Sequence, residues 1–192
     1  MKKILFIGMP GSGKGTQAQR LTVYGLVHIS TGDIIREAFA RQDPLILPFE
    51  EAVNAGHFLP DNLIFNLIEK KVSKVSISKL SNYKGYILDG AVRNIAQAKQ
   101  ALEDKIVDEV FYFHLPEKVA IDRIYKRKNL EGRQDDSPQV VKKRFEIYKQ
   151  HTQPILDYLK SHVKKYHEID ASPPIDQISK EVVKILKLKD VY

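Results

Sequence analysis

The sequence predicts an α/β protein with a doubly wound, five-stranded parallel sheet. The first observation behind this prediction is that five short apolar runs are each followed by a segment with helical periodicity. The second is that these runs are almost continuously apolar, as strands buried on both faces are. The third is a glycine-rich stretch between the first run and the first helical segment. Because ligands of such folds bind beyond the carboxyl ends of the strands, the residues after each run are the functional candidates.

The elements follow one another in five strand–helix units. The predicted strands are residues 3–7, 27–29, 86–88, 110–115 and 166–169, and the helices that follow them are 14–23, 33–41, 95–102, 117–128 and 176–188. Two segments interrupt this order. Residues 42–60 hold three prolines and a glycine around a short helix at 49–55, which predicts an inserted helical arm. Residues 128–137 are polar and lack periodicity, and from Ser137-Pro138 a helix could run to His162.

Composition limits the class of protein. The 192 residues suffice for one buried core, and 43% hydrophobic and 29% charged residues are typical of a globular, ordered chain. No apolar run is long enough to span a bilayer or to act as a signal peptide, so we expect a cytoplasmic protein without membrane association. The absence of cysteine excludes disulfides and thiolate metal sites, and the six histidines show no ligand spacing, so no structural zinc is expected.

The net charge is +7, from 31 basic and 24 acidic residues, and it favours anionic partners. The basic residues form no uninterrupted block of the kind that marks a nucleic-acid-binding tail. The densest cluster, residues 184–189, alternates with apolar residues and is typical of a solvated helix face. We therefore do not predict a nucleic-acid partner.

The strongest motif is the stretch Gly8-Met9-Pro10-Gly11-Ser12-Gly13-Lys14 between a strand and a helix. Its glycines allow a tight turn that directs several backbone N–H groups at one anion. The helix N-terminus adds its dipole, and Lys14 adds a cation for the β- and γ-phosphates. Gly15 stands where the general pattern has a Mg²⁺-binding Ser or Thr, and Thr16 follows one position later. The sequence therefore predicts nucleotide binding, with Mg²⁺ held mainly by phosphates, waters and a remote carboxylate.

Five arginines follow predicted strands or flank the polar loop. They are Arg36, Arg93, Arg127, Arg133 and Arg144. The rigid guanidinium fork binds phosphate oxygens in bidentate fashion and keeps its charge, which suits a reaction that gathers two polyanions. The arginines predict phosphoryl transfer between nucleotides, and the polar loop between two helices is a candidate lid.

Together these motifs resemble the adenylate kinases with a short lid, within the nucleoside monophosphate kinase family. The resemblance covers Ile4 to about Leu186. It rests on residues 8–17 of the phosphate loop, His28 to Arg36, Gly56 to Asp61, Asp122 to Arg127, Gly132 to Asp136 and Lys142 to Arg144. It implies a P-loop NTPase fold with a core of residues 1–29, 60–126 and 138–192, a monophosphate-binding insert at 30–59 and a lid at 127–137.

The resemblance also implies roles for individual residues. The catalytic set would be Lys14, Arg93, Arg127, Arg133 and Arg144. ATP would be bound by Gly11, Ser12, Gly13, Lys14, Gly15, Thr16, Arg123, Arg127 and Pro173, with Arg123 stacked on adenine and the Pro173 carbonyl on its amino group. AMP would be bound by Thr31, Arg36, His57, Phe58, Leu59, Gly90, Arg93, Gln97, Arg133 and Arg144. Asp89 would orient Mg²⁺ through water, and the expected product is ADP, made by a monomer.

The acceptor is indicated by three positions. Thr31 and Gln97 resemble the adenylate kinases, in which the glutamine reads the polar edge of adenine, whereas Asn94 resembles the UMP/CMP kinases. Two indicators of three favour AMP, and a UMP/CMP-type kinase is the alternative. Ala91-Val92 replaces the Phe-Pro that the family usually has, so we expect a trans peptide there and weaker monophosphate binding.

A second class of function is an ATP-hydrolysing assembly or regulatory factor with the same fold. The Ala91-Val92 replacement keeps this alternative open. A GTPase is excluded, because the chain has no Asn-Lys-x-Asp motif to read guanine.

Overall fold

The computed structural model describes residues 1–77, 83–131 and 137–189. Its centre is a five-stranded sheet formed by β1 (Lys2–Gly8), β2 (Leu26–Ser30), β3 (Gly85–Asp89), β4 (Glu109–His114) and β5 (Lys165–Asp170). The strand order is β2-β3-β1-β4-β5, and every pairing is parallel. The predicted doubly wound α/β fold is confirmed.

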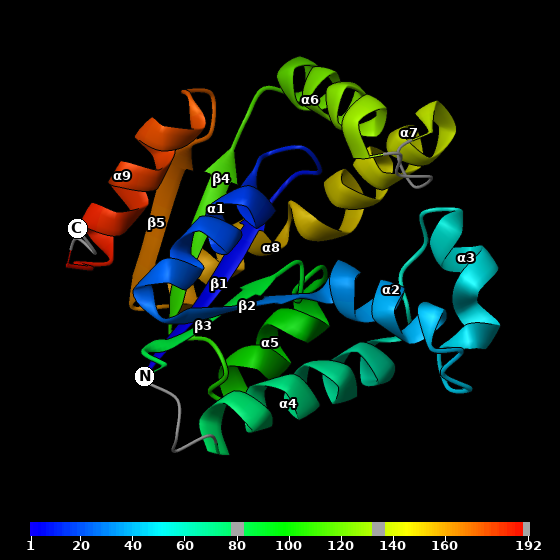
Figure 1. Cartoon of the computed structure of the whole chain (residues 1–192), viewed down its shortest axis with the longest axis horizontal. Helices are drawn as coiled ribbons and strands as arrows, with labels where there is room; N and C mark the ends of the chain where they lie inside the picture. The colour runs from blue at the N-terminus through cyan, green and yellow to red at the C-terminus, as the bar shows by residue number, and fades with distance from the viewer. Residues whose placement is uncertain (78–82, 132–136, 190–192) are drawn as a thin grey trace.

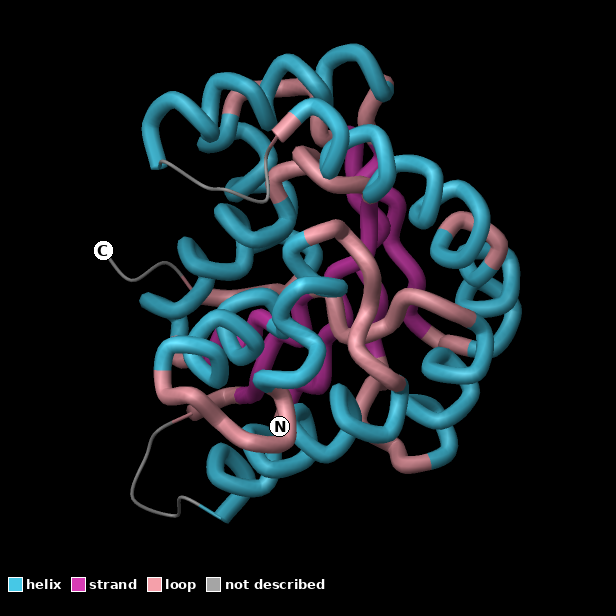
Figure 2. The backbone as a smooth tube through the Cα atoms, turned by 90° about the vertical axis from the view of Figure 1, so that its right-hand side faces the viewer, coloured by secondary structure: helices cyan, strands magenta, loops and turns pink. Residues whose placement is uncertain are grey.

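The helices lie on both sides of this sheet (Figures 1 and 2). They are α1 (Lys14–Arg20), α2 (Thr31–Ala40), α3 (Glu50–Asn54), α4 (Asp61–Ile77), α5 (Ile95–Glu103), α6 (Glu117–Glu131), α7 (Pro138–Ile147), α8 (Ile155–His162) and α9 (Ile175–Ile185). Short 3-10 turns, η1 (Leu21–Tyr24) and η2 (Leu47–Phe49), follow α1 and precede α3. The helix that was predicted over 14–23 thus tightens after Arg20, and the one over 49–55 is shorter.

Alternating residues of the strands feed two hydrophobic clusters. Leu5 and Ile7 of β1 pack with residues of α2, α4, α5 and α8, whereas Ile4 and Phe6 pack with residues of α1, α6, α7 and α9. All four of these β1 side chains are buried. Because successive strand residues point to opposite faces, a continuously apolar strand requires helices on both sides. This is the physical reason that the apolar runs of the sequence predicted the layered architecture.

Helix α4 was not predicted, although it is a long helix. It begins directly after Pro60 and buries Ile64, Phe65, Ile68 and Val72 against the core. Val and Ser in its second half have weaker intrinsic helix propensity than Leu or Ala, so the local signal is diluted. Burial of one face in the cluster with α2 and α5 supplies the stabilisation that propensity does not.

The helix from Ser137 does not run unbroken to His162. Ser137 caps α7 as predicted, but a π-helical segment, η4 (Tyr148–Thr152), follows it and α8 begins after Pro154. The amide of Gln153 donates to the carbonyl of Tyr148 at 2.8 Å, a bond across five residues. Pro154 has no amide hydrogen to continue the regular ladder, which explains the interruption.

The carboxyl ends of β2 and β3 lie level with each other, and β1 extends slightly further, to Gly8. In the sheet register, Asp89 is opposite both Phe6 and Ser30. The residues that follow these three strands therefore meet at one edge. In Figure 1 this edge faces α6 and α7 on one side and α2 and α3 on the other.

Gly85 is required where β3 enters the centre of the sheet. A Cβ at this position would lie 2.6 Å from the amide nitrogen of Lys2 and closer still to its carbonyl oxygen. We predict that Gly85→Ala lowers the free energy of unfolding by about 3 kcal/mol, as overpacking against backbone does. Urea denaturation measures this. Gly32→Ala is the control, because a Cβ there meets the mobile Arg36 guanidinium at 3.2 Å. Equal stability of the two variants would contradict the prediction.

Candidate active site

The phosphate loop joins β1 to α1 and packs against α6. Gly11 has φ +81, and a Cβ on it would lie 2.5 Å from the carbonyl oxygen of Ala120, so no larger residue fits. Ser12 is buried, Gly13 is the N-cap of α1, and Thr16 is exposed. The loop therefore has the glycine conformation and the helix N-terminus that the sequence predicted for anion binding.

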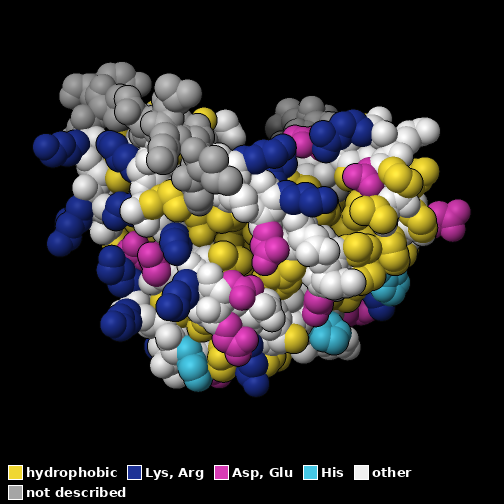
Figure 3. Space-filling view, turned by 90° about the horizontal axis from the view of Figure 1, so that it is seen from below, with side chains coloured by type: hydrophobic (Ala, Val, Ile, Leu, Met, Phe, Trp, Pro, Cys, Tyr) yellow, Lys and Arg dark blue, Asp and Glu magenta, His cyan; other side chains and the backbone are white. Residues whose placement is uncertain are grey.

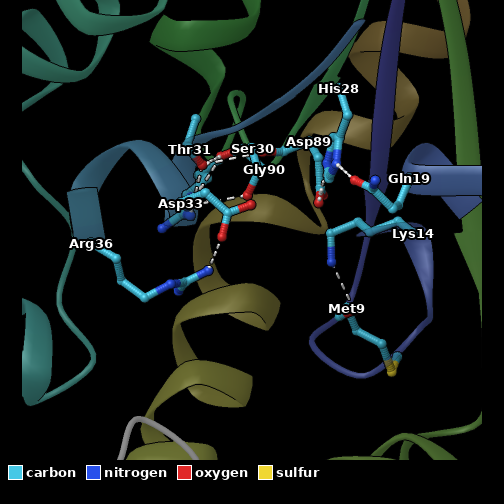
Figure 4. A network of polar contacts seen from close by, with 11 residues as sticks. Met9, Lys14, Gln19, His28, Ser30, Thr31, Asp33, Arg36, Asp89 and Gly90 are labelled. Carbon is cyan, nitrogen blue, oxygen red and sulfur yellow. Dashed lines mark hydrogen bonds and ion pairs between the residues drawn. The ribbon is translucent and has the colours of Figure 1, made fainter. Parts of the chain in front are cut away.

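Lys14 extends back over this loop. Its ammonium donates to the carbonyl of Met9 at 3.3 Å (Figure 4). Burial lowers the pKa of Lys14 to about 8, the carboxylate of Asp89 opposes this shift, and the guanidinium groups of Arg144, Arg93 and Arg127 add to it. The site thus gathers four of the five predicted catalytic cations near one another, before any phosphate is bound.

Asp89 ends β3 beside the start of α1. Its Oδ2 lies 3.4 Å from Nε2 of His28, and a Cβ on Gly15 would lie 3.1 Å from the same oxygen (Figure 4). A Ser or Thr at position 15 would crowd this carboxylate. The structure thereby explains why glycine replaces the hydroxyl residue of the general phosphate-loop pattern.

Arg93 and Thr31 are bound to the backbone at the end of β3. The hydroxyl of Thr31 lies 3.0 Å from the carbonyl oxygen of Gly90, and Nε of Arg93 donates to the same carbonyl at 2.8 Å. Arg93 also donates to the Thr31 hydroxyl at 3.2 Å. Burial and the charge of Arg144 lower the pKa of Arg93 to about 10, so it stays charged at neutral pH.

The inserted arm closes over this arginine. The ring of Phe58 covers the Arg93 guanidinium at 4.6 Å, which is a cation–π contact. A Cβ on Gly56 would lie 3.6 Å from Cγ of Arg144 and 3.5 Å from Val140, so the arm also contacts α7. Of the predicted arm residues, Leu59 is buried and His57 is exposed. Phe58, one of the expected AMP-binding residues, thus places its ring on the Arg93 guanidinium.

Ala91 and Val92 are buried in the core cluster next to Arg93. No cis peptide bond occurs in the described part of the chain, so the predicted trans bond between them is confirmed. The backbone at Arg93 is instead held by a side chain from a distant segment. Thr152, in the π-helical segment η4, donates its hydroxyl to the carbonyl of Arg93 at 3.0 Å. Sequence reasoning missed Thr152, because no local pattern links it to a residue 59 positions earlier.

Arg123 connects α6 to the loop after β5. Its guanidinium donates to the carbonyl of Ala171 at 2.8 Å and to that of Ser172 at 3.2 Å. Pro173 follows Ser172 directly in the chain, so these contacts hold Arg123 near the residue that was expected to bind adenine. A Cβ on Gly13 would lie 4.0 Å from Arg123, which places this pair beside the phosphate loop.

Three predicted residues are not brought into the cluster in the same way. Arg36 is half exposed and forms an ion pair with Asp33 on its own helix (Figure 4). Gln97 is buried, and its amide is bonded to Asp61 and to the backbone of Arg93. Arg133 lies outside the described residues, as do the other residues of 132–136 in the predicted lid, whereas its first residues up to Glu131 continue α6.

No group of three or more histidine or acidic side chains that could hold a metal ion occurs among the residues described. Asp89 is therefore a single carboxylate beside the phosphate loop rather than part of a carboxylate cage. Within the same ranges, no helix has both the length and the apolar character that a membrane span needs.

Known proteins resemble this chain over nearly its full length. The family model described as "Adenylate kinase" matches residues 6–164. An adenylate kinase of Cyanothece sp. is 35% identical over 97% of this chain and 95% of its own length. Those of Xanthomonas oryzae pv. oryzae and Porphyromonas gingivalis are each 34% identical, over 96% and 97% of this chain and 98% and 96% of their own lengths.

The lowered pKa of Lys14 predicts a cost in stability. Below pH 8 the folded state carries a charge that burial and neighbouring cations disfavour, and this cost disappears as pH rises from about 8 towards 10.5. We predict that Lys14→Met raises the urea midpoint of the ligand-free protein at pH 7, and by less at pH 9.5. Lys99→Met, at an exposed position on α5, is the matched control and should change little. A Lys14→Met midpoint at or below that of the control would refute the explanation.

Proposed function

Because the chain belongs to the adenylate kinase family, we propose that this site transfers the γ-phosphate of ATP to AMP and yields two ADP. We assign the transfer to Lys14, Arg93, Arg127, Arg133 and Arg144. The observation that carries the assignment is electrostatic. The charges of Arg144, Arg93 and Arg127 act on Lys14, the first residue of α1 after the phosphate loop.

The cation cluster suits two phosphate-bearing nucleotides better than one. Like charges held together repel, and Asp89 offsets part of this repulsion. The phosphates of ATP and AMP would neutralise the remainder as they bind, and most strongly where negative charge spreads over the transferring group. The acceptor is an ionised phosphate, so the reaction needs no general base. Arm contacts at Phe58 and Gly56 would exclude water from the transfer.

Each nucleotide has a separate group of residues. The loop of Gly11, Ser12, Gly13, Lys14, Gly15 and Thr16, with Arg123, Arg127 and Pro173, would bind ATP. Thr31, Arg36, His57, Phe58, Leu59, Gly90, Arg93, Gln97, Arg133 and Arg144 would bind AMP. Arg36 must leave Asp33, or bind phosphate together with it, to take part.

Mg²⁺ fits this site through Asp89. The carboxylate lies at the N-terminus of α1, where a Cβ on Gly15 would lie 3.1 Å from it, and oxygen donors are those that Mg²⁺ prefers. Asp89 would hold the ion through water, and bound Mg²⁺ would neutralise charge on the phosphates of ATP. His28, 3.4 Å from the carboxylate, helps to fix its orientation.

AMP is preferred over CMP and UMP in this proposal. Asn94, the residue that favoured the UMP/CMP alternative, caps α5 by accepting from the amide of Gln97 at 2.8 Å. Its side-chain amide donates to Asp61. Asn94 is thus engaged in structure rather than directed at a base. We also infer a monomer that works in the cytoplasm, where both nucleotides are available.

The surface gives little support to a nucleic-acid partner. On the face seen from below, basic side chains lie mainly towards one edge and acidic ones are interspersed towards the middle (Figure 3). That face therefore offers no continuous basic track along a phosphate backbone.

One assay tests the proposed function. Purified protein is incubated with Mg·ATP and AMP, CMP, UMP, GMP or no acceptor, and ADP formation is followed. We predict AMP-dependent formation of two ADP per ATP consumed. Arg144→Ala should lower kcat about 10²- to 10³-fold, as the loss of one transition-state donor does. Lys142→Ala, exposed on the same helix, should stay within about twofold. ADP formed equally fast without a monophosphate would establish the hydrolase alternative.

A further inference from the structure

Three polar side chains from two helices meet at the edge of the expected monophosphate site. Asp61 begins α4, directly after the inserted arm, whereas Asn94 is the N-cap of α5 and Gln97 lies in its first turn. Asp61 Oδ1 accepts from Nε2 of Gln97 at 2.7 Å, and its two oxygens accept from Nδ2 of Asn94 at 2.9 and 3.1 Å. One carboxylate therefore holds two side-chain amides.

The contacts determine which way the Gln97 amide faces. A carboxylate only accepts hydrogen bonds, so the nitrogen of Gln97 must point towards Asp61. The backbone amide of Arg93 only donates, and it lies 2.7 Å from Oε1 of Gln97. Both neighbours require the same orientation, and Gln97 is 2% exposed, so packing holds it as well. One N–H and one lone pair of the amide remain for a further partner.

That remaining pair matches an adenine base. Adenine presents a hydrogen-bond acceptor next to an amino donor, and a carboxamide in a fixed orientation pairs with both. If the amide were reversed, its donor and acceptor would exchange places. Control of this orientation is therefore control of which base is accepted.

We propose that Asp61 is a positioning residue that sets the preference for the acceptor base by fixing the Gln97 carboxamide. This inference rests on the proposed function, in which Gln97 reads the monophosphate base. Asp61 acts through Gln97 and not on the reacting atoms. Asn94 keeps Asp61 in place and caps the helix that carries Gln97.

The position of Asp61 makes substitutions there informative. It is partly exposed and lines a groove of about 370 Å³ between α4 and α5, together with Phe65 and Gln100. A neutral side chain at position 61 therefore has access to water, and the substitution does not leave a buried charge without a partner. On the same face, Asp104 accepts from Gln100 at 2.8 Å, which is a matched aspartate–glutamine pair away from Gln97.

The test compares Asp61→Asn and Asp61→Ser with Asp104→Asn and the unmodified protein. Serine suits the start of a helix, so the second substitution guards against misfolding of the first. The measurements are kcat and KM for AMP and for UMP, KM for Mg·ATP, and the thermal midpoint. Uracil presents a ring N–H donor next to a carbonyl acceptor, the reverse of the order in adenine, so UMP reports on the orientation of the amide. We expect both Asp61 variants to raise the KM for AMP about tenfold and to lower the AMP-to-UMP ratio of kcat/KM about tenfold. The KM for Mg·ATP and the Asp104→Asn values should stay within about twofold.

The outcomes separate the two proposals. An AMP-to-UMP ratio unchanged in both Asp61 variants would overturn the role of Asp61, while AMP-dependent activity of the unmodified protein would still support the proposed function. A fall in kcat for both acceptors with an unchanged ratio would make Asp61 purely structural and also overturn its role. Unmodified protein that forms no ADP in an AMP-dependent way would overturn the proposed function, and the role of Asp61 with it.

Discussion

Burial of cations together at the carboxyl edge of the sheet, with their mutual repulsion, is the constraint on which the site depends. Lys14 and Arg93 are held where burial and neighbouring guanidinium groups lower both their pKa values. Such an arrangement is unfavourable in a ligand-free protein, and the rigid sheet register and the phosphate loop maintain it. The same repulsion becomes binding energy when phosphates arrive. The parallel fold serves this purpose, because it brings the ends of β1, β2 and β3 to one edge.

Two departures from the expected pattern have local physical explanations. Gly15 leaves room for the Asp89 carboxylate beside the start of α1. The loop with Ala91-Val92 keeps its backbone through other contacts, namely the Thr152 hydroxyl on the Arg93 carbonyl and the Gln97 side chain on the Arg93 amide. Phe58 supplies an aromatic surface from the arm. The sequence suggested weaker monophosphate binding because the proline is absent. These contacts immobilise Arg93 without a proline.

The sequence predicted those features that local chemistry determines. Glycine spacing predicts the phosphate loop, and continuous apolar runs predict buried parallel strands. Contacts between distant residues left no such signal. Asp61 and Gln97 are 36 positions apart, and Thr152 reaches Arg93 because a π-helical segment shifts its helix. Helix α4 was missed because tertiary burial, rather than propensity, stabilises it.

Proton uptake on ATP binding tests the central claim most directly. Calorimetric titration of Mg·ATP at pH 8.5, in buffers of different ionisation enthalpy, counts the protons exchanged. With a pKa of about 8, most Lys14 side chains are neutral at this pH, and bound phosphates should restore their charge. The account predicts an uptake of about 0.7 proton per ATP in the unmodified protein and none in Lys14→Met. No net exchange in the unmodified protein, or the same uptake in both, would contradict it.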